Sequence, residues 1–166
     1  MRGYLGQTRS TEPSPSLVNS LRRFVTTFFD WLRNLWSRER PRELAADEQL
    51  ARFLLQSNQF SATKGLVKRR AFTPTTKGQT SVYRIQGLQP EGIYRLGRRH
   101  VAPEPTKTIY GWGTVLVRIV EAQGLSVVPD NRPPRHANIE GWPNDKDEQM
   151  LLAHELAAAA SLALWS

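Results

Sequence analysis

Arg135 and His136 are the residues of this chain with the clearest potential for chemistry. They lie side by side in the stretch PPRHANIEGWPNDKDEQ, a proline-stiffened connection that runs from Pro133 to Gln149. An imidazole can act as a general acid or base near neutral pH, and a neighbouring guanidinium can stabilise charge on a phosphate. Under this interpretation the protein is an enzyme acting on a phosphate-containing substrate, with His136 as acid or base and with Arg135, Arg84 or Lys68 as anion holders.

The remaining chemistry-bearing residues give little support to a second reactive site. His154 follows Met150 by four residues in an Ala/Leu-rich run, which predicts that it packs among apolar neighbours. The chain has no cysteine, and it contains no phosphate loop, dinucleotide fingerprint, Gly-x-Ser-x-Gly elbow or His-Glu-x-x-His pair. We therefore expect no metal and no cofactor, and the enzymatic interpretation remains the alternative to a binding function.

Charge is distributed unevenly along the chain. The formal net charge is +8, and residues 64–100 carry nine Lys/Arg against one Asp/Glu, whereas residues 101–166 carry five against eight. Clustered cations favour anionic partners, because they neutralise phosphates and release counterions. The basic side chains that could form a nucleic-acid-binding surface are Lys64, Lys68, Arg69, Arg70, Arg84, Arg95, Arg98 and Arg99.

The pattern of the basic segment indicates electrostatic rather than sequence-specific binding. If residues 66–72 form a strand, Lys68 and Arg70 project to one face and Arg69 to the other, which is typical of an edge strand. Tyr83 or Phe72 could stack on bases, but no zinc finger, RNP strand or helix-turn-helix is present. The first hypothesis is thus a non-catalytic accessory protein that binds DNA or RNA.

An amphipathic helix is predicted near the N-terminus. Apolar residues recur at helical spacing over residues 16–38, among several arginines. Such a helix can pack on its own domain, dock a protein partner or a second copy of the chain, or lie on an anionic membrane surface. The residues expected to make these contacts are Phe24, Phe28, Trp31, Leu32 and Trp36.

The elements that position these residues predict an α+β fold. We expect a disordered tail over residues 1–15, the helical arm over 16–41, and a compact domain over 42–166 with a small, mostly antiparallel sheet. No apolar run is long enough to cross a bilayer and no secretory signal is evident, so we expect a cytoplasmic protein.

Within the compact domain, the pattern predicts a helix over residues 42–60 and a short helix from Pro90 to a stop at Gly97. The final helix, which we expect to pack on the sheet, is predicted from a cap at Asp145 to Trp165, and Trp142 is expected to pin the preceding loop to the core. Strands are predicted at 66–72, 80–85, 106–110, 114–120 and 125–128, although residues 114–123 fit a helix equally well.

The runs VKRRAFTP, TSVYRIQGL and PPRHANIEGWPNDK resemble a pattern of small bacterial proteins with no assigned activity, over roughly residues 50–165. The resemblance implies a bacterial source and an N-terminal helix that is an addition to the domain. It implies no activity, cofactor or functional residue.

If the N-terminal helix lies on membranes, the full chain should pellet with vesicles of anionic phospholipid at low salt and dissociate as salt rises, because its arginines would contact lipid headgroups. Co-sedimentation measures this, with zwitterionic vesicles as the control. A chain that stays in the supernatant with anionic vesicles at low salt would exclude the membrane-surface interpretation.

Overall fold

A computed structural model describes residues 44–165 of the chain. The predicted tail over 1–15, the helical arm over 16–41 and its contact residues Phe24 to Trp36 all lie outside the described residues.

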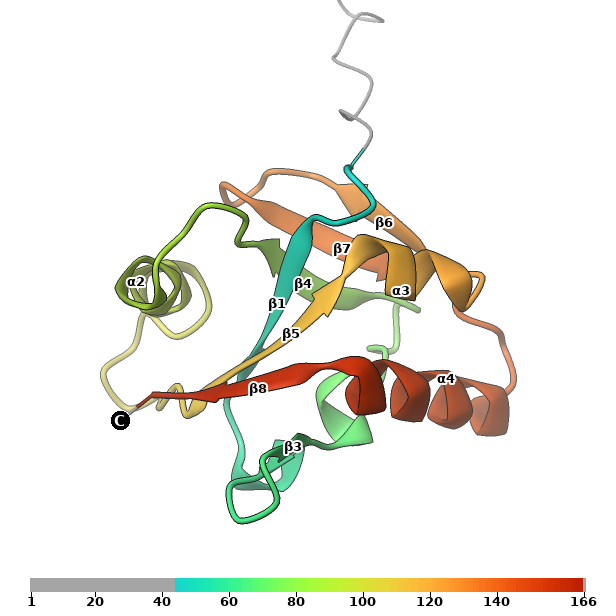
Figure 1. Ribbon diagram of the computed structural model, residues 1–166, viewed down its shortest axis with the longest axis horizontal. Coiled ribbons are helices and arrows are strands. Elements are labelled where there is room, and N and C mark those ends of the chain that lie inside the picture. Colours follow the sequence, from blue (N-terminus) through green and yellow to red (C-terminus); the bar gives the residue numbers. More distant parts are fainter. Residues whose placement is uncertain (1–43, 166) are drawn as a thin grey trace, which may run out of the picture. The chain divides into compact units, whose positions relative to one another are not determined.

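The described residues are organised around one six-stranded sheet in which every strand pairs antiparallel with its neighbours. The strand order is β6-β7-β4-β1-β5-β8 (Figure 1). This confirms the predicted mostly antiparallel α+β class. The strands are β1 (Gln49–Leu54), β4 (Thr80–Arg84), β5 (Gly111–Leu116), β6 (Ser126–Pro129), β7 (His136–Glu140) and β8 (Ser161–Leu164); β2 (Phe60–Ser61) and β3 (Leu66–Val67) form a separate hairpin.

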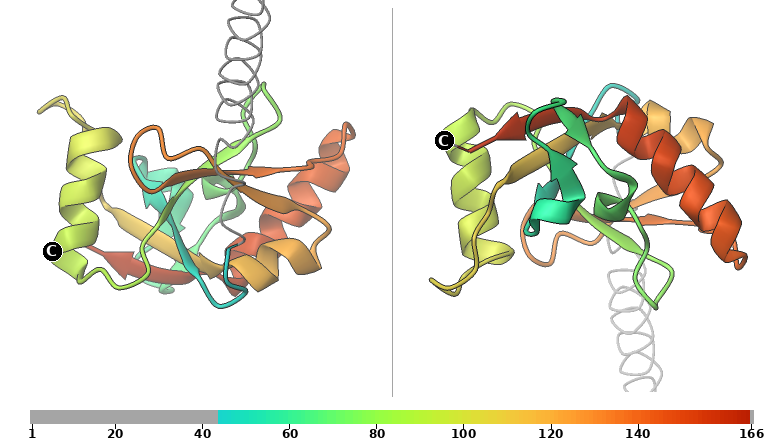
Figure 2. Two further views of the ribbon diagram at one scale, coloured as in Figure 1. Left: turned by 90° about the horizontal axis from the view of Figure 1, so that it is seen from above. Right: turned by 90° about the horizontal axis from the view of Figure 1, so that it is seen from below.

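Helices cover both faces of the sheet (Figure 2). The helices are α2 (Pro90–His100), α3 (Val117–Ala122) and α4 (Lys146–Ala159), with short 3-10 turns η1 (Ser57–Gln59) and η2 (Arg69–Ala71). One face packs against α3, α4 and η2, and the other packs against α2. None of the helices described in residues 44–165 combines the length and the apolar character needed to cross a bilayer.

Two hydrophobic clusters, one on each face, hold these layers together. The larger cluster centres on Leu50, Leu54, Phe72, Val115 and Leu156, all of them at most 2 % exposed. The smaller one, beneath α2, includes Phe53, Tyr83, Ile93, Ile109 and Trp112. Because burying one such side chain contributes roughly 1.5 to 3 kcal/mol, the central strands are fixed by their burial on both sides.

The helix predicted over residues 42–60 is wrong, because Gln49–Leu54 is strand β1 at the centre of the sheet. Leu50 and Leu54 enter the larger cluster, while Ala51 and Phe53 enter the smaller one. A strand buried on both faces is a nearly continuous apolar run, which helical spacing also fits. Burial therefore outweighed the helix preference of Leu, Ala, Arg and Gln.

Other predicted strands were confirmed or corrected in part. The strand over 80–85 is confirmed as β4, and that over 125–128 is confirmed as β6, shifted by one residue. The strand predicted over 66–72 shortens to two residues before η2, and residues 106–110 form no strand. The ambiguous residues 114–123 contain both forms, since β5 ends at Leu116 and α3 begins at Val117.

The final helix begins as predicted, with the Asp145 side chain accepting hydrogen bonds from the backbone N–H groups of Asp147 and Glu148. Its predicted end is wrong, because the chain leaves the helix at Ala160 and forms β8 along the edge of β5. An Ala/Leu-rich run carries little information about this change. Trp142 is buried as predicted, and its Nε1 donates a hydrogen bond to the carbonyl oxygen of Ile139.

Helix α2 starts at Pro90 as predicted but continues past Gly97 to His100. Gly97 is needed for packing rather than for a stop: a Cβ atom there would lie 2.5 Å from Phe53 Cε1 and 2.9 Å from Ile109 Cδ1. The bare backbone lets the helix lie close against the sheet.

We therefore expect Gly97→Ala to lower the free energy of unfolding by about 1 to 3 kcal/mol, because the added methyl overpacks the α2 side of the sheet. The matched control is Gly92→Ala in the same helix, where a Cβ would find its nearest neighbours at 3.8 Å. That variant should gain roughly 0.5 to 1 kcal/mol from better helix propensity. Urea unfolding measures both, and equal effects of the two substitutions would contradict the proposed close packing.

Candidate functional site

The candidate site lies on β4 and β7, which are neighbours in the sheet. His136 is the first residue of β7, so its placement in a loop connection was wrong. Tyr83 pairs with His136 and Ser81 with Asn138. Since side chains alternate between faces along a strand, these four side chains share the α2-side face, while Val82, Ala137 and Ile139 enter the larger cluster opposite.

His136 connects two polar side chains. Its Nε2 atom lies 2.6 Å from the Oγ atom of Ser81, and its Nδ1 atom lies 2.7 Å from Oδ1 of Asp130. The imidazole also meets the Tyr83 ring edge to face, with the centroids 5.2 Å apart. The result is a continuous hydrogen-bonded chain from Ser81 through His136 to Asp130, which we call the His136 relay.

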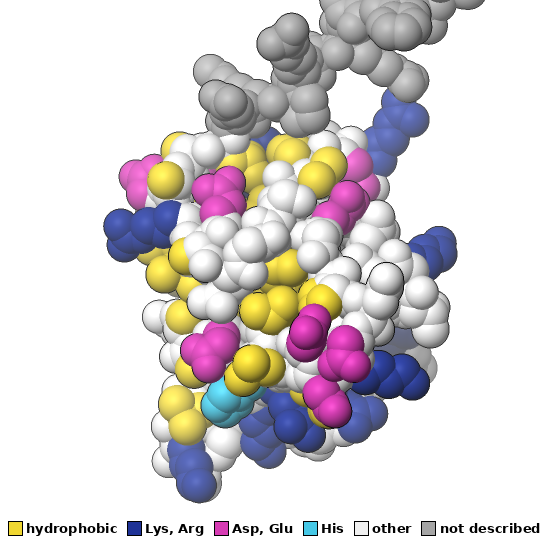
Figure 3. Space-filling view, turned by 90° about the vertical axis from the view of Figure 1, so that its right-hand side faces the viewer, with side chains coloured by type: hydrophobic (Ala, Val, Ile, Leu, Met, Phe, Trp, Pro, Cys, Tyr) yellow, Lys and Arg dark blue, Asp and Glu magenta, His cyan; other side chains and the backbone are white. Residues whose placement is uncertain are grey.

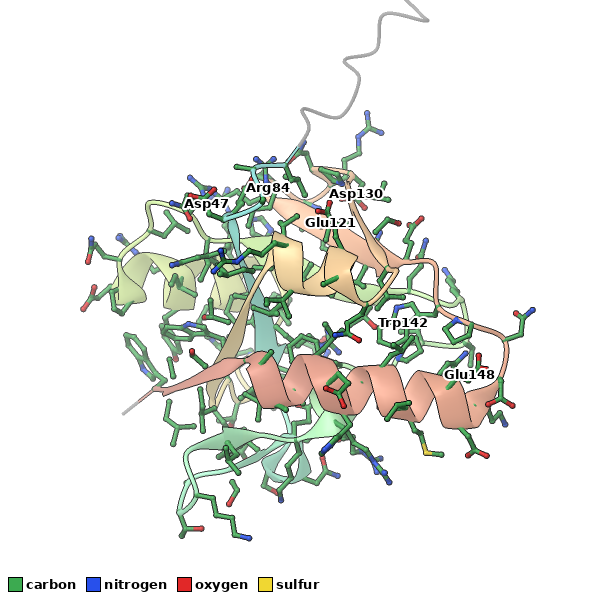
Figure 4. All side chains as sticks on the ribbon, turned by 45° about the vertical axis from the view of Figure 1, so that its right-hand side comes forward. Asp47, Arg84, Glu121, Asp130, Trp142 and Glu148 are labelled. Atoms are coloured by element: carbon green, nitrogen blue, oxygen red, sulfur yellow. The ribbon has the colours of Figure 1, made fainter. Side chains whose placement is uncertain are left out.

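Asp130 lies in the turn between β6 and β7 (Figure 4), and this turn holds it against His136. The backbone N–H groups of Asp130 and Asn131 donate to the carbonyl oxygen of His136, and the Arg132 N–H donates to Asp130 Oδ1 at 3.1 Å. Asn131 and Arg135 have φ angles of 52° and 67°, a left-handed conformation that is uncommon for residues other than glycine. Local strain of this kind often accompanies functional sites.

The charges in the relay perturb two neighbouring groups. Burial alone would raise the pKa of Asp130, but hydrogen bonds from His136 and from the Arg132 N–H outweigh it and hold the pKa below its usual value. Burial raises the pKa of Tyr83, and the negative charge of Asp130 raises it further. Asp130 is therefore ionised, and the Tyr83 phenol protonated, at neutral pH.

A partly buried arginine supports the strand behind the relay. Arg52 of β1 donates from Nε to the carbonyl oxygen of Ala71 at 2.6 Å and from Nη1 to the carbonyl oxygen of Ser81 at 2.9 Å. Burial lowers the pKa of this guanidinium. Arg52 thus ties β1 to η2 and to the backbone of Ser81 from the opposite face of the sheet.

A second feature is a cleft between α2 and the β6–β7 turn, which we call the α2 cleft. Its volume is about 510 Å³, and it contains basic and apolar side chains but no Asp or Glu. Arg135 is held in place there, because its Nη1 donates to the carbonyl oxygens of Arg84 and Gln86, both at 3.2 Å. The lining residues are Leu88, Gly92, Arg95, Leu96, Arg99, His100, Pro134 and Arg135.

The eight basic residues predicted to bind nucleic acid do not form one surface. Lys68, Arg69 and Arg70 lie at η2, which packs against α4, whereas Arg95, Arg98 and Arg99 lie on α2 at the other face. Lys64 lies in the turn between β2 and β3. Arg84 forms an ion pair with Glu48, with Nε 2.6 Å from Oε1. Only Arg95 and Arg99 of this group enter the α2 cleft.

The two residues of the predicted catalytic pair bind different partners. Arg135 binds backbone carbonyls beside the α2 cleft, and His136 binds Ser81 and Asp130. His154 does not pack among apolar residues as predicted, because it is exposed on α4.

Sequence reasoning missed Ser81, Asp130 and His100. The pairing of β4 with β7, which joins residues 55 positions apart, is the signal that brings Ser81 to His136. Because the prolines around residues 136–140 predict a connecting loop, the sequence does not predict this pairing.

No family model matches the chain, and neither a related curated protein nor a similar solved structure was found. The resemblance to small bacterial proteins therefore contributes nothing to the assignment of the site, which depends on the geometry described above.

We expect Asp130→Asn to lower the free energy of unfolding at neutral pH by at most about 1 kcal/mol, because the side chain is 41 % exposed and solvent screens its charge. A carboxyl with a lowered folded-state pKa stabilises the fold above the unfolded-state value, near 3.8. This contribution to stability is lost as the pH falls through the folded-state pKa of Asp130, which lies below the unfolded-state pKa. Urea unfolding should therefore show the difference between the proteins shrinking below about pH 5.

The control is Asp47→Asn, since the Asp47 side chain is exposed and makes no hydrogen bond within residues 44–165. Its effect should be small at every pH. If the effect of Asp130→Asn does not depend on pH, the ionised carboxylate has no role in the relay.

Proposed function

We propose that this protein is a binding or accessory protein whose α2 cleft holds the phosphate groups of a nucleic acid. The observation that carries the proposal is the convergence of Arg95, Arg99 and Arg135 on one cleft that contains no acidic side chain. Guanidinium groups bind phosphate oxygens in a bidentate manner, and they keep their charge at any physiological pH.

The cleft has the size and the mixed lining that a nucleotide unit requires. Its volume of about 510 Å³ falls within the usual range of small-ligand sites, roughly 300 to 1,000 Å³. Leu88, Leu96 and Pro134 offer apolar contacts for a sugar or base beside the arginines. Arg135 is already oriented by two carbonyl groups, so less side-chain entropy is lost when it binds.

The charges on the side of the domain that carries α3 and α4 also favour an approach of nucleic acid from the α2 side. Exposed acidic side chains lie in several groups on the side of the domain that carries α3 and α4, and basic side chains lie around the margin of this side (Figure 3). These acidic side chains include Glu121, Asp145, Asp147, Glu148 and Glu155. Because such a face repels a polyanion, the α2 side is the favoured side of approach.

The proposal predicts that Arg95→Ala with Arg99→Ala weakens binding of a labelled single-stranded oligonucleotide at least about tenfold at low salt, because two charged hydrogen-bonding partners are removed. The slope of log affinity against log salt should also flatten, by up to about 0.7 for each phosphate of a single strand that the variant no longer neutralises. Fluorescence anisotropy of the full chain measures both.

The matched control is Arg69→Ala with Arg70→Ala, which removes the same charge from the η2 side of the sheet. Its affinity should fall much less. If both double variants lose affinity equally, binding follows net charge alone and the α2 cleft is not the site. A mononucleotide triphosphate tested in parallel distinguishes a free nucleotide from a strand as the source of the phosphate.

A further inference from the structure

We propose that Ser81, His136 and Asp130 form a nucleophilic triad in which Ser81 attacks carboxylic esters and related acyl compounds. The proposal is independent of ligand binding in the α2 cleft. It uses none of the arginines there, and it stands on the geometry of the His136 relay alone.

The order of contacts around the imidazole is the one that nucleophilic catalysis requires. Asp130 lies at Nδ1 and Ser81 at Nε2, at 2.7 and 2.6 Å. A carboxylate at Nδ1 favours the tautomer whose proton lies on Nδ1, which leaves Nε2 free to accept the proton of Ser81. The same three groups recur in this order in serine hydrolases on unrelated folds, so the arrangement is recognised by geometry rather than by sequence.

Each member of the relay is held by further contacts. Asp130 accepts a hydrogen bond from the Arg132 N–H, and the His136 backbone is bonded within the same turn. Ser81 pairs with Asn138 in the sheet, and Arg52 donates a hydrogen bond to the carbonyl oxygen of Ser81. Preorganisation of this kind keeps the nucleophile and the base within reaction distance.

The exposure of the three side chains also fits a reactive centre. The His136 side chain is 12 % exposed and that of Asp130 is 41 % exposed. Ser81 is half-buried rather than enclosed. The cluster beneath α2 includes no residue of β6 or β7, so the polar side chains of β7 lie beside that core rather than within it.

The reaction follows from these contacts. Ser81 Oγ forms a bond to the acyl carbon while its proton passes to His136 Nε2, and the leaving group departs with that proton as its bond to the acyl carbon breaks. Water then attacks the acyl-Ser81 intermediate, giving its proton to Nε2. Release of the carboxylic acid returns the proton to Ser81, so that one ester and one water give one acid and one alcohol.

A fluorophosphonate probe tests the nucleophile directly, because an activated serine oxygen bonds to its phosphorus and displaces fluoride while His136 takes the proton. Full-length protein is incubated with the probe, and the modified residue is located by peptide mass spectrometry. Ser126, exposed on β6, serves as a reference within the same molecule. We expect Ser81 to react at least about 100-fold faster than Ser126.

Three further measurements separate a catalytic role from a structural one. His136→Gln should reduce the reaction of Ser81 to the rate of Ser126, and the wild-type rate should fall on acidification because a protonated imidazole cannot accept the serine proton. Asp130→Asn should slow the reaction at least about tenfold. Thermal melting verifies folding, and if His136→Gln does not fold, Asp130→Asn and the pH profile decide.

A Ser81 that reacts no faster than Ser126, or whose rate does not depend on His136, Asp130 and pH, would overturn the proposal. Ser81→Ala should leave oligonucleotide binding unchanged, so failure of the triad and failure of the α2 cleft are distinguishable.

Discussion

The position of Ser81 depends on the partly buried guanidinium of Arg52, which lies on the opposite face of the sheet. Strands β1 and β4 pair at Leu50 with Arg84 and at Ala51 with Tyr83, and the Ile85 N–H donates to the Gln49 carbonyl oxygen beside them. At the other end of this short pairing, the Arg52 side chain supplies the next link, to the Ser81 carbonyl oxygen. The same guanidinium binds the carbonyl oxygen of Ala71. Removing a cation from water is costly unless its donors are satisfied, and these carbonyl groups satisfy the partly buried guanidinium in part. The hydrogen bonds of Arg52 thereby help to hold β4 where it diverges from β1, together with its pairing to β7.

This anchor explains why the two candidate sites occur on the α2 side of the sheet. On the other face, η2, α3 and α4 cover the strands with a continuous apolar cluster. On the α2 side the apolar cluster ends at β4, and the neighbouring strand β7 presents His136 and Asn138. The β6–β7 turn then contributes to both sites, with Asp130 in the relay and Arg135 in the α2 cleft.

The fold class, β4, β6, the start of α2 and the cap of α4 could be predicted because each depends on local signals such as alternation, Pro90 or Asp145. Strand β1 could not, since Leu50, Phe53 and Leu54 have spacing that fits a helix as well as a strand buried on both faces. Strand β8 was hidden in an Ala/Leu-rich run whose identity is decided by pairing with β5.

The candidate site could be predicted only in part for the same reason. His136 could be selected from its residue type and its setting among prolines. Ser81 and Asp130 become partners only through the register of β4 against β7 and through a left-handed turn, which are tertiary features. The basic residues were grouped by their positions in the sequence, whereas the sheet separates them.

The pairing of β5 with β8 has a consequence for the order in which the domain assembles during synthesis. Residues 111–114 of β5 pair with residues 161–164, so one edge of β5 has no partner until the segment after α4 has left the ribosome. A side chain at Gly111 would collide with the Ala163 carbonyl group, so the late strand has a narrow, closely fitted place to fill. Until then the nascent domain carries an open apolar edge, and it is in this interval that it is most exposed to mispairing with other chains.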